Sequence, residues 1–172
     1  FESGVTSILP LYGLALGLSA ATAALLVSAS GFGSAVVMLP AGMLADQFSD
    51  PGKGRRTLMV AFAAITLIAT CVIPFVAHVT WLAWPIVFLW GGAGGSLYTL
   101  AMIDIGTREQ GITLVNSTAM LVLPYTLGGL VASATSGALI QWSPTWGFPA
   151  LLLTVASIGL LALVRTRRMS NI

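Results

Sequence analysis

Few side chains in this sequence could carry chemistry, and the most crowded group of them is one short charged stretch. Residues 44–56 read LADQFSDPGKGRR, and this stretch holds two of the chain's five acidic residues and three of its seven basic residues. Opposite charges this close together can form ion pairs. The stretch therefore raises the question of what such contacts would hold in place.

The other reactive groups exclude several kinds of site. Cys71 is the only cysteine and His78 the only histidine, which excludes an intrachain disulfide, a CxxC metal site and a His-rich metal site. An intramembrane protease built on Ser96 would need a histidine in another apolar segment, and there is none. The basic residues are too few and too scattered for a nucleic-acid surface. We expect no catalytic residue, no metal and no cofactor.

The composition indicates what surrounds these charges. Hydrophobic residues make up 57% of the 172 residues and charged residues only 7%, and the mean hydropathy is +0.98. A soluble domain typically carries about 25% charged residues. So few charges cannot cover a surface that faces water. The sequence therefore predicts an all-α polytopic membrane protein with the lipid bilayer as its first partner.

Six segments approach the length of about 20 mostly apolar residues that a membrane-crossing helix needs. Gly-, Pro- and Ser-containing breaks separate them, including SDPGKG before the third segment and GTREQG before the fifth. We expect six transmembrane helices at roughly 1–17, 20–45, 57–77, 82–105, 112–141 and 146–165.

The basic residues then fall on one side of a six-span arrangement. They lie between the second and third segments, between the fourth and fifth, and after the sixth. The positive-inside rule places this side, with both chain ends, in the cytoplasm. Four tryptophans lie at the opposite ends, as an aromatic belt would require. The basic residues are Lys53, Arg55, Arg56, Arg108, Arg165, Arg167 and Arg168, and the tryptophans are Trp81, Trp84, Trp142 and Trp146.

Small residues recur at helical spacing within these segments. Such spacing lets two helices approach closely in lipid, and we expect packing to be the main role of these residues. A place along a substrate path is the alternative for some of them. The series are Gly13 with Gly17, Gly91 with Gly95, and Gly129 with Ser133 and Gly137.

The charged stretch resembles the signature loop of the major facilitator superfamily, written G-x-L-a-D-r-x-G-r-[RK]. The matching positions are Gly42, Leu44, Asp46, Gly54, Arg55 and Arg56. The residues FSDPGK lengthen the loop, and Gln47 stands where a basic residue is common. PLYG, GGAGGSLYTLAM and NSTAMLVLPYTLGGL are similar to the seventh, tenth and eleventh helices of a twelve-helix facilitator. The likeness is greatest to the YcaD-like branch.

This resemblance implies that residues 1–172 form a C-terminal six-helix half, made of two inverted three-helix repeats. The N-terminal half of the same transporter would be its missing partner. The protein would move a small solute across a bacterial inner membrane by alternating access. The alternative is a non-transporting fragment or subunit that needs a partner half.

The resemblance also implies a cytoplasmic latch made of Gly42, Asp46, Arg55 and Arg56. Asp46 would contact an arginine and the N-terminal end of a neighbouring helix, where the helix dipole favours an anion. Such contacts would hold the outward-facing state. The alternative is that the basic residues only set topology and touch anionic lipid.

Glu2 is the acidic residue expected inside the membrane. It lies fifteen residues before Gly17, which in a helix is roughly 22 Å below the expected exit. Burial raises the pKa of a carboxyl group, so Glu2 could exchange a proton or bind a polar solute. Solvation at the start of the chain is the alternative.

Other polar residues suggest smaller roles. Asp104 and Arg108 are four residues apart, a spacing that suits an ion pair on a helix, and we expect a structural or gating pair there. Tyr98, Asn116 and Tyr125 lie in apolar segments. Each could donate a hydrogen bond into a substrate cavity or to a neighbouring helix.

Overall fold

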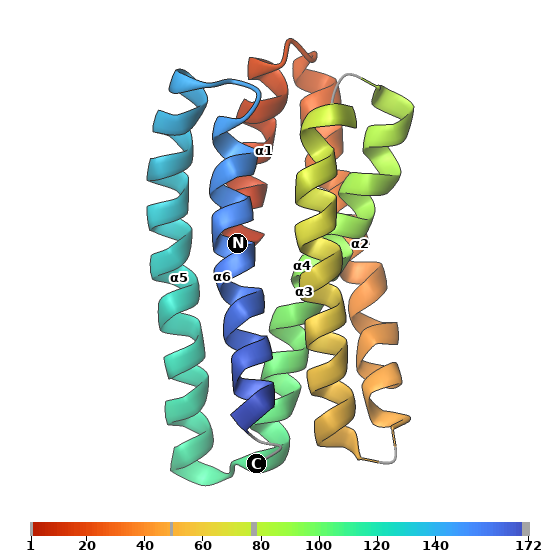
Figure 1. Cartoon of the computed structure of the whole chain (residues 1–172), viewed down its shortest axis with the longest axis vertical. Helices are drawn as coiled ribbons and strands as arrows, with labels where there is room; N and C mark the ends of the chain where they lie inside the picture. The colour runs from red at the N-terminus through yellow and green to blue at the C-terminus, as the bar shows by residue number, and fades with distance from the viewer. Residues whose placement is uncertain (1, 49, 77–78, 170–172) are drawn as a thin grey trace.

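The computed structural model is a bundle of six helices whose chain direction alternates between two ends (Figure 1). It describes residues 2–48, 50–76 and 79–169, without the side chains of residues 2–7, 51, 80 and 166–169. The all-α prediction is confirmed for this part of the chain. The helices are α1 (Glu2–Ala15), α2 (Ala20–Asp46), α3 (Pro51–Val76), α4 (Thr80–Arg108), α5 (Gly111–Trp142) and α6 (Gly147–Met169).

Five of these six helices, α2 to α6, are long and apolar enough to cross a membrane. The described α1 has 14 residues, about 21 Å of helix, which is less than the roughly 30 Å of a hydrocarbon core. Six helices were predicted as spans, and the structure supports that length for five of them. In Figure 1 α1 covers only the upper part of the bundle.

The third helix begins earlier than the sequence predicted. SDPGKG was expected to be a break and the helix to start near residue 57, but α3 starts at Pro51. Asp50 Oδ1 accepts hydrogen bonds from the backbone N–H groups of Gly52 and Lys53, each at 3.1 Å. An aspartate cap followed by proline at the first helical position is a strong helix start. The basic residues expected in a loop therefore lie on the first turns of α3.

The turns between the helices lie alternately at the two ends of the bundle, as the charge pattern predicted. The α2–α3 and α4–α5 turns lie at one end, together with the end of α6 (Figure 1). We call this the basic end, because the described Lys53, Arg55, Arg56, Arg108 and Arg165 lie toward it. The other three turns lie at the opposite end. The cytoplasmic orientation of the basic end remains a prediction.

Helices α2 and α4 cross with almost no side chain between their backbones. A Cβ atom added to Gly33 would overlap the carbonyl oxygen of Phe88, and one added to Gly91 would overlap the carbonyl oxygen of Ser30. One added to Gly95 would overlap the hydroxyl of Ser34. The predicted packing role of Gly91 and Gly95 is therefore confirmed. Close approach of this kind maximises dispersion contacts where lipid provides no hydrophobic drive.

Gly17 does not pack between helices as predicted. Its φ of +82° is a conformation that favours glycine, and no described atom lies within 4 Å of the Cβ it lacks. The N–H of Leu18 donates to the carbonyl of Gly13 at 3.0 Å. Gly17 therefore ends α1 as a C-terminal cap.

The main hydrophobic core lies toward the end opposite the basic end and joins α1, α2, α3, α4 and α6. Trp90 is fully buried there, and its Nε1 donates to Thr70 Oγ1 at 2.8 Å. Thr70 in turn donates to the carbonyl of Thr66 at 2.7 Å. This chain of bonds satisfies a buried indole in a region without water and fixes α4 against α3.

The α2–α4 crossing generates a stability prediction. Gly91→Ala should lower the free energy of unfolding by about 1–3 kcal/mol, because a methyl group there meets backbone that cannot move aside alone. Gly128→Ala on α5 is the matched control, since no described atom lies within 4 Å of its added Cβ. The control should be neutral or slightly stabilising. Detergent-to-SDS unfolding curves measure both, and equal losses would contradict the close contact.

Candidate functional site

An ion-pair cluster at the basic end joins α3 to α4. The cluster consists of Arg55, Asp104, Thr107 and Arg108. Arg55 Nε lies 3.3 Å from Asp104 Oδ1, and its Nη2 donates to Thr107 Oγ1 at 2.9 Å. Arg108 Nη2 lies 3.1 Å from the same Asp104 oxygen. A single carboxylate oxygen therefore receives two guanidinium groups from two helices.

Burial makes the Arg55 contact the stronger of the two. The Arg55 side chain is 7% exposed, that of Asp104 27% and that of Arg108 61%. A buried guanidinium needs a charged partner, because removing the partner leaves an uncompensated charge. The exposed Arg108 can exchange its contact for water at little cost. Asp104 is thus the partner on which the position of Arg55 depends.

The α2–α3 turn fixes where Arg55 points. The backbone N–H of Gly54 donates to the carbonyl of Asp50 at 2.9 Å. A Cβ on Gly54 would come within 2.6 Å of the ring of Phe48, so only glycine allows that ring to lie against α3. The cap at Asp50 and the contact at Gly54 together set the direction of the first turn of α3.

The electrostatics of this turn favour the ionised cap. The backbone N–H of Lys53 is the main cause that holds the pKa of the Asp50 carboxyl below its ordinary value, assisted by the Lys53 ammonium group. Lys53 Nζ lies 3.5 Å from Asp50 Oδ2, with the Lys53 side chain 83% exposed. An ion pair this exposed adds little stability. The cap therefore acts through its hydrogen bonds to the backbone.

The structure places the other residues of the predicted latch less centrally. Asp46 is exposed at the end of α2 and makes no ion pair within the described part of the chain. Gly42 of α2 faces Ile103 of α4, whose Cδ1 atom lies 3.5 Å from an added Cβ. Arg56 is half-buried on α3. The resemblance pointed to Asp46 as the partner of an arginine, but the structure gives that place to Asp104.

The expected i, i+4 pair of Asp104 and Arg108 is present. Its connection to Arg55 was not foreseen. A signal for it existed in the sequence, because Asp104, at the end of a predicted helix, and Arg55, in a predicted loop, were both expected on the same side of the membrane. Thr107 was not singled out at all, although it lies three residues after Asp104 and donates to that residue's carbonyl at 3.0 Å.

Of the predicted cavity residues, the structure brings two together. The rings of Tyr98 on α4 and Tyr125 on α5 lie 5.2 Å apart at 47°. Asn116 is exposed on α5, nine residues and about 13 Å of helix from Tyr125. The backbone of Glu2 begins α1, but its side chain lies outside the described part.

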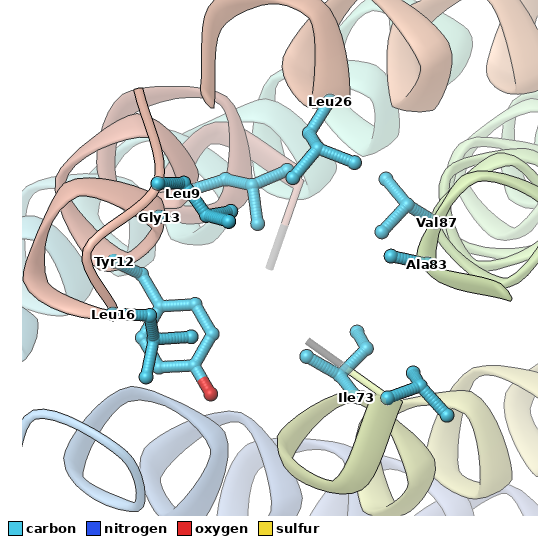
Figure 2. A pocket seen from close by; sticks show the side chains of 10 residues that line it. Leu9, Tyr12, Gly13, Leu16, Leu26, Ile73, Ala83 and Val87 are labelled. Atoms are coloured by element: carbon cyan, nitrogen blue, oxygen red, sulfur yellow. The ribbon is translucent and has the colours of Figure 1, made fainter. Parts of the chain in front are cut away.

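An enclosed pocket near the opposite end offers no solute site. It lies among α1, α2, α3 and α4, and its lining is apolar apart from the hydroxyl of Tyr12 (Figure 2). That hydroxyl donates to the carbonyl of Thr145 at 3.0 Å. The pocket volume of about 20 Å³ is room for about one water molecule. Nor do the described residues contain a group of three or more His, Cys, Asp or Glu side chains that could hold a metal ion.

Comparison with known proteins gives one result that covers nearly the whole chain. The family model of the Major Facilitator Superfamily matches residues 1–171. No curated protein and no solved structure matches the chain.

The cap at the start of α3 predicts a pH dependence. Because the folded pKa of Asp50 is lowered, its stabilisation is complete at neutral pH and is lost as pH falls below about 4. Asp50→Asn keeps a capping oxygen but does not titrate. We therefore expect the melting temperature of the wild type to exceed that of this variant at pH 7, and the difference to shrink as the pH is lowered to 3.

Lys53→Gln is the control for what lowers the pKa of Asp50. Its backbone N–H, the main cause, remains, so the acid-dependent loss should persist almost unchanged. A melting-temperature difference between wild type and Asp50→Asn that stays constant from pH 7 to pH 3 would contradict an ionised cap.

Proposed function

Because the chain belongs to the Major Facilitator Superfamily, whose members are secondary transporters and not enzymes, we propose that it is the C-terminal six-helix half of a transporter that moves a small solute by alternating access. The observation that carries this proposal is the family match over residues 1–171 on a six-helix all-α bundle. A complete facilitator is built from two six-helix halves. The order of the sequence motifs supports the assignment to the C-terminal half, and the YcaD-like branch is proposed from the resemblance of the sequence alone.

The proposed partner is the N-terminal half of the same transporter. Helix α5 supports it, because this helix is buried along little of its length within the described bundle. Its exposed side carries large apolar residues such as Met120, Leu123 and Leu130. A second six-helix half would cover part of this surface and lipid the rest. We place the assembly in a bacterial inner membrane with the basic end in the cytoplasm, as the charge pattern supports.

The ion-pair cluster supports a revised form of the latch. In this form Asp104 holds Arg55 inside the half, and the exposed Asp46 at the end of α2 is left to contact the partner half. Gly42 keeps the face of α2 small beside Ile103, and Arg56 adds positive charge near the turn. Contacts between Asp46 and the partner would stabilise the outward-facing state and break when the halves rock.

The proposed solute path and coupling ion involve Glu2 and three polar residues of α4 and α5. Glu2 is the candidate for proton exchange, because a carboxyl inside the membrane is costly and residues of this kind are therefore candidates for a function. Tyr98 and Tyr125 support a cavity wall, because their ring contact brings two phenol side chains to the same place between α4 and α5. Asn116 lies on the other side of α5 and nine residues nearer its start, so it would contact the solute at a separate point of the path.

Proteoliposome uptake by the full-length protein under an imposed pH gradient tests the proposed function. A screen of labelled solutes should find one whose uptake follows the gradient, and Glu2→Gln should lose that dependence, because an amide cannot exchange the coupling proton. Gradient-independent uptake that the variant retains would exclude proton coupling through Glu2. If no solute moves, the alternative of a non-transporting subunit is favoured.

The latch is tested by the balance of inward- and outward-facing states. Asp104→Asn should lower the outward-facing fraction about tenfold, because the lost charge releases Arg55 from its place. Asp46→Asn should shift the balance in the same direction through the lost contact with the partner. Distances between spin labels on the two halves report the populations, and Lys53→Gln is the surface-charge control. Populations that do not change in either Asp variant would exclude the latch.

A further inference from the structure

A crevice of about 180 Å³ lies between α3, α4 and α6. In Figure 1 α3 and α6 lie side by side with α4 behind them. Ala63 and Thr66 of α3, Leu97 of α4 and Gly159 of α6 are among its lining residues. At its rim Val155 is 42% exposed, so the crevice reaches the surface of the bundle.

The lining accepts hydrocarbon and little else. Thr66 is its one polar residue, and its hydroxyl donates to the carbonyl of Phe62 at 2.8 Å. The crevice therefore offers no free donor to a polar ligand. An apolar cavity of about 150 Å³ stays dry and takes up small hydrocarbon molecules. A space of this kind in a membrane-crossing bundle fits part of an acyl chain.

One position of α6 leaves room at the crevice. Gly159 is exposed and is among the lining residues, and no described atom lies within 4 Å of the Cβ that this glycine lacks. A larger apolar side chain at this position therefore has room to extend over the crevice and to compete with an acyl chain.

A basic residue lies on the same side of α3, nearer the basic end. Arg56 is seven residues before Ala63, which is two helical turns on one face and about 10 Å along the axis. Arg56 is half-buried on the second turn of α3. A lipid whose chain lies in the crevice would carry its headgroup toward this guanidinium.

From these observations we propose that the crevice binds one acyl chain of an anionic phospholipid, with its phosphate near Arg56. The bilayer supplies this ligand at high local concentration. The hydrocarbon part of the site comes from α3, α4 and α6, and the choice of headgroup comes from the charge at the start of α3. The proposal does not depend on transport activity.

Lipid titration of the full-length protein in detergent, followed by native mass spectrometry, tests the proposal. Wild type should bind phosphatidylglycerol about fivefold more tightly than phosphatidylcholine, the preference expected from one basic residue near the surface. Arg56→Gln should abolish the preference. Lys53→Gln, which removes a more exposed charge of the same end, should keep it. A preference that survives Arg56→Gln would overturn the headgroup assignment.

Gly159→Leu tests the crevice itself. It should weaken the tight binding of both lipids about tenfold, because the new side chain fills the space. Gly128→Leu makes the same change at an exposed position of α5 and should bind lipid like wild type. Equal binding by Gly159→Leu and wild type would overturn the site.

A second measurement needs no variant and stands even if Gly159→Leu fails to fold. Phosphatidylglycerol with a photoreactive diazirine in its acyl chain should label peptides of α3 and α6 that contain residues 63–66 and 155–163. Labelling spread evenly over all helices, α5 included, would show an unspecific lipid shell and overturn the proposal.

Discussion

The arrangement of this bundle depends on the backbone contact between α2 and α4. Glycines at the crossing let the two helices touch through carbonyl groups, and larger residues at Gly33 or Gly91 would force them apart. The position of α4 determines where Asp104 lies, and Asp104 determines where the buried Arg55 of α3 can find its partner. A packing contact in the middle of the membrane thus sets the geometry of the charges at its edge.

Those charges show how a protein with few ionisable groups uses them. The carboxylate of Asp104 is shared by two arginines of very different exposure, and Asp50 satisfies the start of α3. Both acids are placed next to groups that must be compensated: a buried guanidinium and free N–H groups. In the hydrocarbon region the described polar side chains are mostly hydroxyls that donate to their own helix, as Thr66, Thr70 and Ser96 do. These hydroxyls thereby meet the requirement that lipid imposes on polar groups, whereas the buried Ser136 hydroxyl has no hydrogen-bond partner among the described residues.

The sequence predicted the helices well and the contacts between them only in part. Hydropathy and turn residues locate five long helices, because length and apolarity are local properties. The start of α3 was missed because SDPG resembles a turn, although an aspartate before a proline can equally cap a helix. The small residues of α4 predicted a close contact but could not say that α2 would provide the other surface. The pairing of Arg55 with Asp104 joins residues 49 positions apart, and nothing local in the sequence distinguishes this pair from Arg55 with Asp46.

The two-residue connection between α4 and α5 has a mechanical consequence. Only Glu109 and Gln110 separate the end of α4 from the start of α5. Two extended residues reach about 7 Å, whereas the hydrocarbon core is about 30 Å thick. The start of α5 therefore stays within a few ångströms of the end of α4 in any arrangement of the bundle. The last turn of α4 carries Asp104 and Arg108, so a displacement of either helix at this end also displaces the carboxylate that holds Arg55.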